Sequence, residues 1–245
     1  MKKKTARLGS DANHIDMYIS REHSFTTDSV LLAGFSGYTG NEPALDLGAG
    51  CGIIAFLWAL KGGHISALEI STEAVVLMER TCRENRLGNV SVICGDIRQA
   101  ATLAPAREAM LIACNPPYFR AADGRRGNNL SRERARSDTG CSLGDVAAAA
   151  GYLLHENGRL CLCVPPFRVD DLAAGLNANG LFITRIRAVH ERAKEPARLL
   201  LVEARRQEPA AHEALPPLIA RDENGGETAE LKAIYSSFVD SGADE

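Results

Sequence analysis

Short apolar runs alternate with amphipathic stretches along most of the chain. Runs of strand length predict strands over residues 43–47, 64–70, 90–94, 109–114, 158–164, 182–189 and 198–204. Between them, apolar positions at helical spacing predict helices over residues 28–35, 51–61, 72–87, 142–154 and 169–178. Strands that alternate with helices form a mainly parallel sheet covered on both faces, so the pattern predicts an α/β fold of the doubly wound, Rossmann-like kind.

The last two predicted strands differ from the others in how they are connected. Only about eight residues separate them, too few for a helical crossover, so we expect an antiparallel hairpin at the C-terminal side of the sheet. No linker divides the chain, which predicts a single domain over residues 1–245. Within this domain we distinguish three segments: a polar lead over 1–27, an arginine-rich loop over 119–141 and an acidic extension over 207–245.

Composition is that of a folded globular protein. Of 245 residues, 45% are hydrophobic and 24% are charged, which argues against disorder. No apolar run reaches the roughly 18 residues of a membrane span and no signal-peptide core follows Met1, so we expect a cytoplasmic protein without membrane contact. The seven cysteines form no C-x-x-C pair and no two histidines stand four apart, which predicts buried thiols and no metal site.

Charge is distributed unevenly, although the net charge is only −3. Residues 1–206 hold 26 Lys and Arg against 22 Asp and Glu, whereas residues 207–245 hold 2 against 9. The body is therefore basic and the C-terminal extension acidic. A basic body suits an anionic polymer as partner, while an extension that merely keeps the protein soluble is the simpler explanation of the acidic residues.

A glycine-rich segment follows the first predicted strand of the sheet and opens a helix. It reads Asp46-Leu-Gly48-Ala-Gly50-Cys-Gly52, at the position where open α/β sheets bind ligands. A dinucleotide fingerprint would continue to a small residue at position 53, but Ile53 stands there, so NAD is the weaker candidate. The Asp46 carboxylate would repel a pyrophosphate but suits an ammonium or sulfonium group. S-adenosylmethionine carries both of these groups, and we expect it as the cofactor.

Two further acids follow the next two strands. Glu69 ends the second strand and Asp96 comes just after the third, so three neighbouring strands present carboxylates at one edge of the sheet. Glu69 can accept hydrogen bonds from two ribose hydroxyls, and Asp96 from an adenine amino group, with the Ile97 backbone as a donor to the ring. Each acid taken singly is more often a solvated strand end or a helix cap.

The fourth strand ends in Asn115-Pro116-Pro117-Tyr118. The prolines hold Asn115 extended, so its amide oxygen and the neighbouring main-chain carbonyl can point into one cavity. Two acceptors that grip the hydrogens of a planar amine favour a more electron-rich nitrogen as a methyl group arrives. Tyr118 would stack on the ring of the target, and a tetrapeptide that simply ends a strand is the competing interpretation.

These motifs resemble those of a known enzyme class. Residues 46–52, Glu69, residues 95–98 and residues 115–119 are similar to the motif series of class I S-adenosylmethionine-dependent methyltransferases that act on exocyclic or amide nitrogens. Residues 27–32, 132–136, 141–145 and 216–218 resemble, in addition, the bacterial tRNA1(Val) adenine-N(6)-methyltransferase family, and the resemblance covers nearly the whole chain. It implies methyl transfer to the 6-amino group of an unpaired adenosine in the tRNA anticodon loop.

The resemblance also implies roles for individual residues. For cofactor binding it implies Thr27, Asp28, Asp46, Gly48, Gly50, Gly52, Glu69, Ile70, Asp96, Ile97 and Asn115. For catalysis it implies Asn115, Pro116 and Tyr118. Pro117 and Phe119 are expected beside them, in contact with the substrate.

The segment after this tetrapeptide is strongly basic. Residues 120–136 contain six arginines against two acids, a local charge of +4. Guanidinium groups placed here can clamp phosphates around an extruded base. The expected RNA contacts are Arg120, Arg125, Arg126, Arg132, Arg134 and Arg136. RNA, and tRNA in particular, is therefore the expected partner, and a merely soluble lid is the alternative interpretation of this loop.

Other functions remain open at this point. Adenine in ribosomal RNA and glutamine in proteins also carry planar nitrogens that the same tetrapeptide can hold. Glutamine methyltransferases, however, usually carry a helical domain before the glycine loop, whereas only 45 residues precede Asp46 in this sequence. An NAD-dependent reductase would need the fingerprint that Ile53 interrupts. A non-catalytic RNA-binding protein with the same fold is the fourth alternative.

Overall fold

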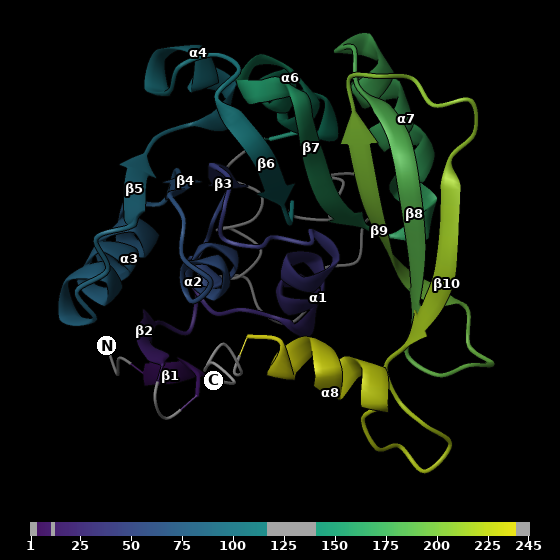
Figure 1. Cartoon of the computed structure of the whole chain (residues 1–245), viewed down its shortest axis with the longest axis horizontal. Coiled ribbons are helices and arrows are strands. Elements are labelled where there is room, and N and C mark those ends of the chain that lie inside the picture. Colours follow the sequence, from purple (N-terminus) through teal and green to yellow (C-terminus); the bar gives the residue numbers. More distant parts are fainter. Residues whose placement is uncertain (1–3, 11–12, 117–140, 239–245) are drawn as a thin grey trace.

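The centre of the molecule is an eight-stranded sheet (Figure 1). The structure, a computed structural model, describes residues 4–10, 13–116 and 141–238. The strand order is β10-β8-β9-β7-β6-β3-β4-β5. The strands are β3 (Ala44–Leu47), β4 (Ile65–Glu69), β5 (Val90–Cys94), β6 (Ala109–Cys114), β7 (Leu154–Val164), β8 (Phe182–His190), β9 (Ala197–Arg205) and β10 (Glu213–Ile219).

Helices cover both faces of this sheet, as the alternating pattern predicts. They are α1 (Thr27–Phe35), α2 (Ile53–Ala59), α3 (Thr72–Glu84), α4 (Ala100–Leu103), α6 (Leu143–Leu153), α7 (Val169–Ala178) and α8 (Ala229–Ser236), with short 3-10 turns η1 (Ile97–Gln99) and η2 (Pro166–Arg168). Helices α1, α2 and α3 share one hydrophobic cluster, while α6 and α7 share the other. Successive residues of a strand point to opposite faces, so Cys161 of β7 joins the first cluster and Leu162 the second.

The predicted topology is confirmed. Strands β3 to β7 pair in parallel with their neighbours, and β9 is antiparallel to both β7 and β8. The strands over residues 90–94 and 109–114 and the helix over 169–178 lie where the pattern puts them. The helix expected over 51–61 spans only Ile53–Ala59, and it begins no earlier because Gly52 before it has a left-handed backbone with φ of +79°. The helix expected over 72–87 ends at Glu84, and β7 begins four residues earlier than expected, at Leu154.

The N-terminal lead is more ordered than its polar composition indicates. It contains a separate antiparallel pair, β1 (Lys4–Gly9) and β2 (His14–Ile19). Ile15 and Met17 of β2 are buried, and two side chains of the α3 region hold the β2 backbone: Asn85 Oδ1 accepts from the Asp16 N–H and Thr81 Oγ1 from the Tyr18 N–H. The sequence pattern gave no indication of this pair, which buried alternate side chains and polar partners far along the chain stabilise.

The acidic extension likewise contributes to the fold. Strand β10 pairs in parallel with β8 at the edge of the sheet, with a register shift between Leu215 and Leu218. The two residues between them are prolines, which lack an N–H and are tolerated at an edge or an irregularity. Helix α8 begins after Thr228, whose hydroxyl accepts from the Leu231 N–H, and Leu231 is buried. Sequence periodicity missed both elements because each is short and largely exposed.

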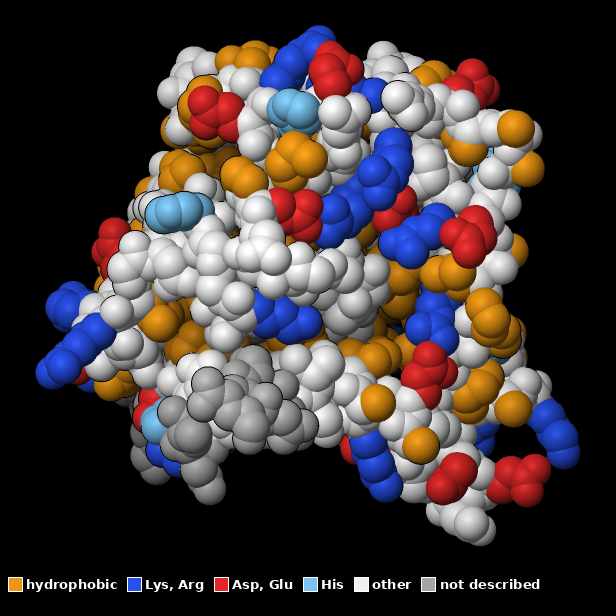
Figure 2. Space-filling view, viewed as in Figure 1, with side chains coloured by type: hydrophobic (Ala, Val, Ile, Leu, Met, Phe, Trp, Pro, Cys, Tyr) orange, Lys and Arg blue, Asp and Glu red, His pale blue; other side chains and the backbone are white. Residues whose placement is uncertain are grey.

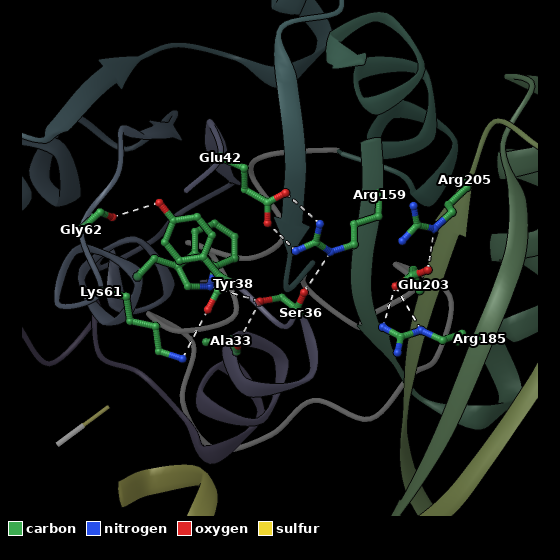
Figure 3. A network of polar contacts seen from close by, with 11 residues as sticks. Ala33, Ser36, Tyr38, Glu42, Lys61, Gly62, Arg159, Arg185, Glu203 and Arg205 are labelled. Carbon is green, nitrogen blue, oxygen red and sulfur yellow. Dashed lines mark hydrogen bonds and ion pairs between the residues drawn. The ribbon is translucent and has the colours of Figure 1, made fainter. Parts of the chain in front are cut away.

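A network of ion pairs crosses the face of the sheet that carries α1 (Figure 3). Arg159 of β7 donates to both oxygens of Glu42 and to the Ser36 carbonyl at the end of α1. Arg185 of β8 and Arg205 of β9 both donate to the buried Glu203. Figure 2 shows the resulting mixture of basic and acidic side chains over β7, β8 and β9.

Candidate active site

A cavity of about 510 Å³ opens at the carboxyl ends of β3, β4, β5 and β6. This size is suitable for a cofactor-sized ligand. Its lining consists of Glu22, His23, Ser24, Phe25, Thr26, Asp28, Ser29, Asp46, Leu47, Gly48, Ala49, Gly50, Cys51, Ile53, Ile54, Glu69, Ile70, Ser71, Asp96, Ile97, Cys114, Asn115, Pro116, Cys141 and Val146. The carboxyl ends of four neighbouring strands thus bring together residues that lie about 70 positions apart.

The glycine loop forms the floor of the cavity. Gly48 and Gly50 line it with φ angles of +74° and +58°, in the left-handed region that glycine adopts without strain. Gly52 does not line it: a Cβ there would lie 2.7 Å from Met78 Sδ and 2.8 Å from a Phe56 ring carbon. Gly52, expected as a cofactor residue, is therefore needed for close packing of α2 against α3.

Asp46 is the most deeply buried acid of the site, with 1% of its surface exposed. Its Oδ2 accepts a hydrogen bond of 3.1 Å from the Ala55 N–H in α2. Burial, opposed by this hydrogen bond and reinforced by the nearby Glu69, raises the pKa of Asp46 to about 7. A cationic group bound in the cavity would favour the ionised form of Asp46. The buried carboxyl group is therefore suited to an ammonium or sulfonium ligand.

Glu69 connects the end of β4 to the glycine loop. Its Oε2 accepts from the Gly50 N–H at 2.7 Å and its Oε1 from the Ser71 N–H at 2.8 Å. Each carboxylate oxygen has two lone pairs, so each keeps one for a ligand hydroxyl. These contacts fix the carboxylate in place before any ligand arrives.

Asp96 lies at the wall of the cavity but is paired with an arginine. Its oxygens accept from the Arg98 backbone N–H and from the Arg98 guanidinium at 2.9 to 3.0 Å. The hydrogen bonds from Arg98 hold the pKa of Asp96 below its usual value, so the carboxylate is ionised at neutral pH. Ile97, which follows it, also lines the cavity, as does Ile70 after β4.

Asn115 directly follows β6 and lines the cavity beside Pro116. Its Nδ2 donates to Ser29 Oγ of α1 at 2.8 Å, and its Oδ1 lies 3.1 Å from the Cys163 Sγ of β7. The side-chain amide is thus held between two elements that lie far from it in the sequence. Pro117, Tyr118, Phe119 and the six arginines over 120–136 lie outside the described residues, so their expected roles stay predictions.

Thr27 and Asp28 of the first turn of α1 were both expected at the cofactor, but only Asp28 lines the cavity. Asp28 lines it and pairs with Arg198 of β9, with Oδ1 2.6 Å from Nη1. Thr27 is not among the lining residues, and its hydroxyl accepts from the Tyr235 hydroxyl of α8 at 3.3 Å. Thr27 therefore contacts α8, where sequence reasoning expected a contact with the cofactor.

Sequence reasoning missed the segment before α1, which forms one wall of the cavity through residues 22–26. His23 Nε2 lies 3.1 Å from Ser71 Oγ, so this segment contacts the turn after β4. It has no strand or helix periodicity, and its polar residues resemble an ordinary loop. Ser29, Cys114 and Cys141 were also missed, because a small polar residue in a helix or a thiol in a strand gives no functional signal in a sequence.

Among the described residues, the thiols and acids outside the cavity form no candidate metal site. The cysteines are free, and Cys51, Cys114, Cys161 and Cys163 are buried as expected, whereas Cys82 and Cys141 are half-buried and Cys94 is exposed. Within residues 4–10, 13–116 and 141–238, no three His, Cys, Asp or Glu side chains gather in a way that would hold a metal ion. Helices in the same part of the chain are all too short or too polar to cross a membrane.

Comparison with known proteins identifies the family. Residues 27–132 match the family model of the methyltransferase small domain. A tRNA1(Val) (adenine(37)-N6)-methyltransferase of Aeromonas hydrophila is 33% identical over 184 residues, which cover 71% of this chain and 74% of the relative. The chain belongs to this family. A relative of the same name from Shewanella halifaxensis is 29% identical over 72% of each chain. The enzyme is thus an S-adenosylmethionine-dependent methyltransferase, as its motifs indicate.

Solved structures confirm the fold. A predicted O-methyltransferase from Agrobacterium tumefaciens superposes with a TM-score of 0.69 at 20% identity, over 86% of this chain and 97% of that one. The T. thermophilus 16S rRNA N2 G1207 methyltransferase, solved with AdoMet and guanosine, gives a TM-score of 0.56 at 17% identity and covers 84% of this chain and 51% of that chain. At these identities the likeness concerns the fold alone, and it confirms the predicted class I methyltransferase sheet.

Proposed function

We propose that this methyltransferase modifies the exocyclic 6-amino group of an unpaired adenosine in tRNA. The observation that carries the proposal is the Asn115 side-chain amide, which lies at the wall of the cavity that Asp46 and Glu69 also line. The relatives that share at least two thirds of their length with this chain are named for adenine 37 of tRNA1(Val), which supports the same class of substrate here. A tRNA substrate places the enzyme in the cytoplasm.

The residues of the cavity fit the cofactor. When bound, S-adenosylmethionine supplies an electrophilic methyl group on a sulfonium sulfur. Asp46, which burial leaves partly protonated near neutral pH, gains a cationic partner, and Glu69 has lone pairs left for ribose hydroxyls. Gly48 and Gly50 have no Cβ and let the ligand approach the backbone closely.

Asn115 and Pro116 would orient the target amine. The lone pair of an aromatic amine is delocalised into its ring, so the nitrogen attacks poorly on its own. Hydrogen bonds from the amine to Asn115 Oδ1 and to the Pro116 carbonyl would favour a more pyramidal nitrogen, without any strong base. Holding the amine in line with the transferred methyl group would supply most of the acceleration through proximity.

Recognition of the RNA rests, in this proposal, on the segment after Pro116. Tyr118 would stack on the target base, flanked by Pro117 and Phe119, and the arginines over 120–136 would bind the surrounding phosphates. An anticodon-loop adenosine is already unpaired, so extruding it from its stack costs only a few kcal/mol or less.

The test is a side-by-side methylation assay with isotope-labelled cofactor. Unmodified tRNA, ribosomal RNA and a peptide-chain release factor are offered to the purified protein, and the labelled product is identified by mass spectrometry. We expect N6-methyladenosine in tRNA. Label in ribosomal RNA adenine or in a glutamine of the release factor would overturn the assignment of substrate, and RNA binding without transfer to any of the three would overturn the catalytic assignment.

A further inference from the structure

A separate cavity of about 610 Å³ opens on the sheet face that carries α1. Helix α1 ends at Phe35, and the cavity begins at the residues that follow it. Its lining shares no residue with the cofactor cavity and consists of Ser36, Gly37, Thr39, Asn41, Glu42, Arg159, Arg185, Glu203 and Arg205. Three arginines against two glutamates give this lining a net charge of +1. The cavity therefore suits a ligand that carries negative charge.

Strand pairing brings the three arginines together on one face of the sheet. By the antiparallel register of β7 with β9, Arg159 falls opposite Arg205. In the pairing of β9 with β8, Glu203 is opposite Arg185. Because side chains alternate between the faces of a strand, Glu203 and Arg205 point to the same side. Figure 3 shows the three guanidinium groups on these neighbouring strands, with Glu203 in contact with two of them.

Glu203 holds two of the guanidinium groups and has no capacity left for a ligand. Its Oε2 accepts from Nε and Nη2 of Arg185 at 3.1 and 2.6 Å. Its Oε1 accepts from Nε of Arg205 at 2.8 Å and from the Thr184 hydroxyl at 2.9 Å. A carboxylate offers about four lone-pair sites, so all of them are occupied. This carboxylate, which is 2% exposed, fixes both guanidinium groups from below and leaves their outer sides to the cavity.

The charge of Glu203 is maintained by the same contacts. Burial raises its pKa, but the hydrogen bond from Arg205 and the charge of Arg185 lower it further, so the pKa lies below its usual value. The carboxylate is therefore ionised at neutral pH. It keeps the two arginines in place over the pH range in which a phosphate group is charged.

The two guanidinium groups keep N–H donors for a ligand. An arginine carries five N–H groups. Within the described part of the chain, Arg205 donates a hydrogen bond only through Nε, and Arg185 only through Nε and Nη2. Their side chains are 40% and 33% exposed, so a ligand can reach the other donors. Arg159 differs, because it donates to both oxygens of Glu42 and to the Ser36 carbonyl and is thereby engaged in the fold.

We propose that this cavity is a separate binding site that takes a phosphate group on the outer N–H groups of Arg185 and Arg205. The planar fork of a guanidinium group matches the oxygens of a phosphate, and two such groups offer several donors to one anion. Because Glu203 orients both arginines in advance, they lose little conformational freedom when the ligand binds.

The site is independent of the methyl transfer. It adjoins the C-terminal end of α1, whereas Asp28 and Ser29 at the N-terminal end line the cofactor cavity. The inference therefore goes beyond the proposed function and does not depend on which nitrogen the enzyme methylates. A phosphodiester of a bound nucleic acid and a free phosphate-bearing molecule share the chemistry that the site recognises, so the experiment offers both.

The test measures the binding of two probes to the full chain by isothermal titration at constant ionic strength. The probes are inorganic phosphate and a single-stranded oligoribonucleotide without terminal phosphates. We expect Arg205→Ala and Arg185→Ala each to weaken the binding of at least one probe about 10-fold, because a hydrogen bond to a charged group is lost. A loss for the oligoribonucleotide identifies a phosphodiester as the ligand, and a loss for inorganic phosphate alone identifies a free phosphate-bearing molecule.

Salt dependence gives a readout that a merely structural role would not change. If Arg205 contacts a phosphodiester, the slope of log affinity against log salt concentration for the oligoribonucleotide should become shallower by about 0.7 in Arg205→Ala. Glu203 keeps Arg185 and Thr184 as partners in this variant, so we expect it to fold, and thermal unfolding verifies this. Its affinity for S-adenosylmethionine should stay within about 2-fold of the wild-type value, because Arg205 does not line the cofactor cavity.

Arg192→Ala is the matched control. Arg192 lies after β8, is 53% exposed and does not line the cavity, so its replacement removes the same charge from the surface outside the site. We expect it to change the affinity for either probe by less than about 2-fold. Binding of neither probe by the wild type, or equal losses in Arg205→Ala and Arg192→Ala, would overturn the proposal. Neither result would affect the proposed function, which the methylation assay tests separately.

Discussion

Glu69 and Gly50 are joined by a hydrogen bond of 2.7 Å, from the Gly50 N–H to Glu69 Oε2. The bond ties the glycine loop after β3 to the end of the neighbouring strand β4. Glu69 is 8% exposed, so the charge-assisted contact is shielded from water. One carboxylate therefore sets the shape of the loop and also remains available to a ligand.

Replacing Glu69 by Gln should weaken cofactor binding by about 10-fold or more. The side-chain amide of Gln could accept from only one of the two backbone N–H groups of Gly50 and Ser71, and its own N–H donors would face the other. One hydrogen bond to a charged group contributes about 1.5 to 3 kcal/mol. Isothermal titration with S-adenosylmethionine measures the change. Glu79→Gln, an exposed acid of α3, is the control and should leave the affinity unchanged. Equal affinities of Glu69→Gln and wild type would remove Glu69 from the cofactor site.

Alanine at Gly52 should destabilise the fold more than alanine at Gly50. Both positions have positive φ, so both variants incur about 1 to 2 kcal/mol of backbone strain. Only the Gly52 methyl collides with Met78 and Phe56, which adds about 1 to 3 kcal/mol, whereas nothing lies within 4 Å of a Cβ at Gly50. Urea unfolding of the two variants measures the difference. Equal losses of unfolding free energy would show that packing at Gly52 is looser than the structure indicates.

Asp46 should make stability depend on pH. Its pKa is about 7 in the folded chain, raised above the value of about 3.9 in an unfolded chain. Between these values the folded state holds more protons, so this contribution to stability is present below about pH 4 and is lost as the pH rises through 7. Without cofactor, wild type should lose about 2 to 3 kcal/mol of unfolding free energy between pH 5 and pH 8 relative to Asp46→Asn. Parallel pH curves for the two proteins would contradict the raised pKa.

Glu42→Gln should lower stability without altering cofactor affinity. Glu42 holds the guanidinium of Arg159, which is only 16% exposed and would lose its bidentate partner (Figure 3). Loss of such a partner costs about 1 to 3 kcal/mol. Glu230→Gln, which interrupts the more exposed pair with Arg187, should cost under about 1 kcal/mol. Thermal unfolding compares the stability of the two variants. A larger loss of stability in Glu230→Gln than in Glu42→Gln would contradict the prediction.

The central part of the fold follows from sequence, whereas its two ends do not. Strands such as β3 and β6 are apolar runs next to turn residues, and burial of most of their side chains makes that pattern strong. The β1 and β2 pair depends on Asn85 and Thr81, about 65 residues further along the chain. Strand β10 carries two prolines that normally argue against a strand. Long-range partners of this kind leave no local periodicity.

The candidate site, like the fold, could be predicted from the sequence only in part. Asp46, Glu69 and Asn115 end predicted strands, and the geometry of a parallel sheet brings strand ends together, so these positions were predictable. The pairing of Asp96 with Arg98 and the contact of Thr27 with Tyr235 depend on side-chain directions that a sequence does not specify. The same holds for Ser29 and Cys163, which reach Asn115 from 86 and 48 residues away.

The most direct test of the account is nucleoside mass spectrometry of tRNA from cells that lack the protein and are complemented with wild type or Asn115→Ala. The account predicts that N6-methyladenosine at one tRNA position appears with wild type and is absent with Asn115→Ala, although the variant still binds S-adenosylmethionine. Identical nucleoside profiles with and without the wild-type protein, or full modification by Asn115→Ala, would contradict it.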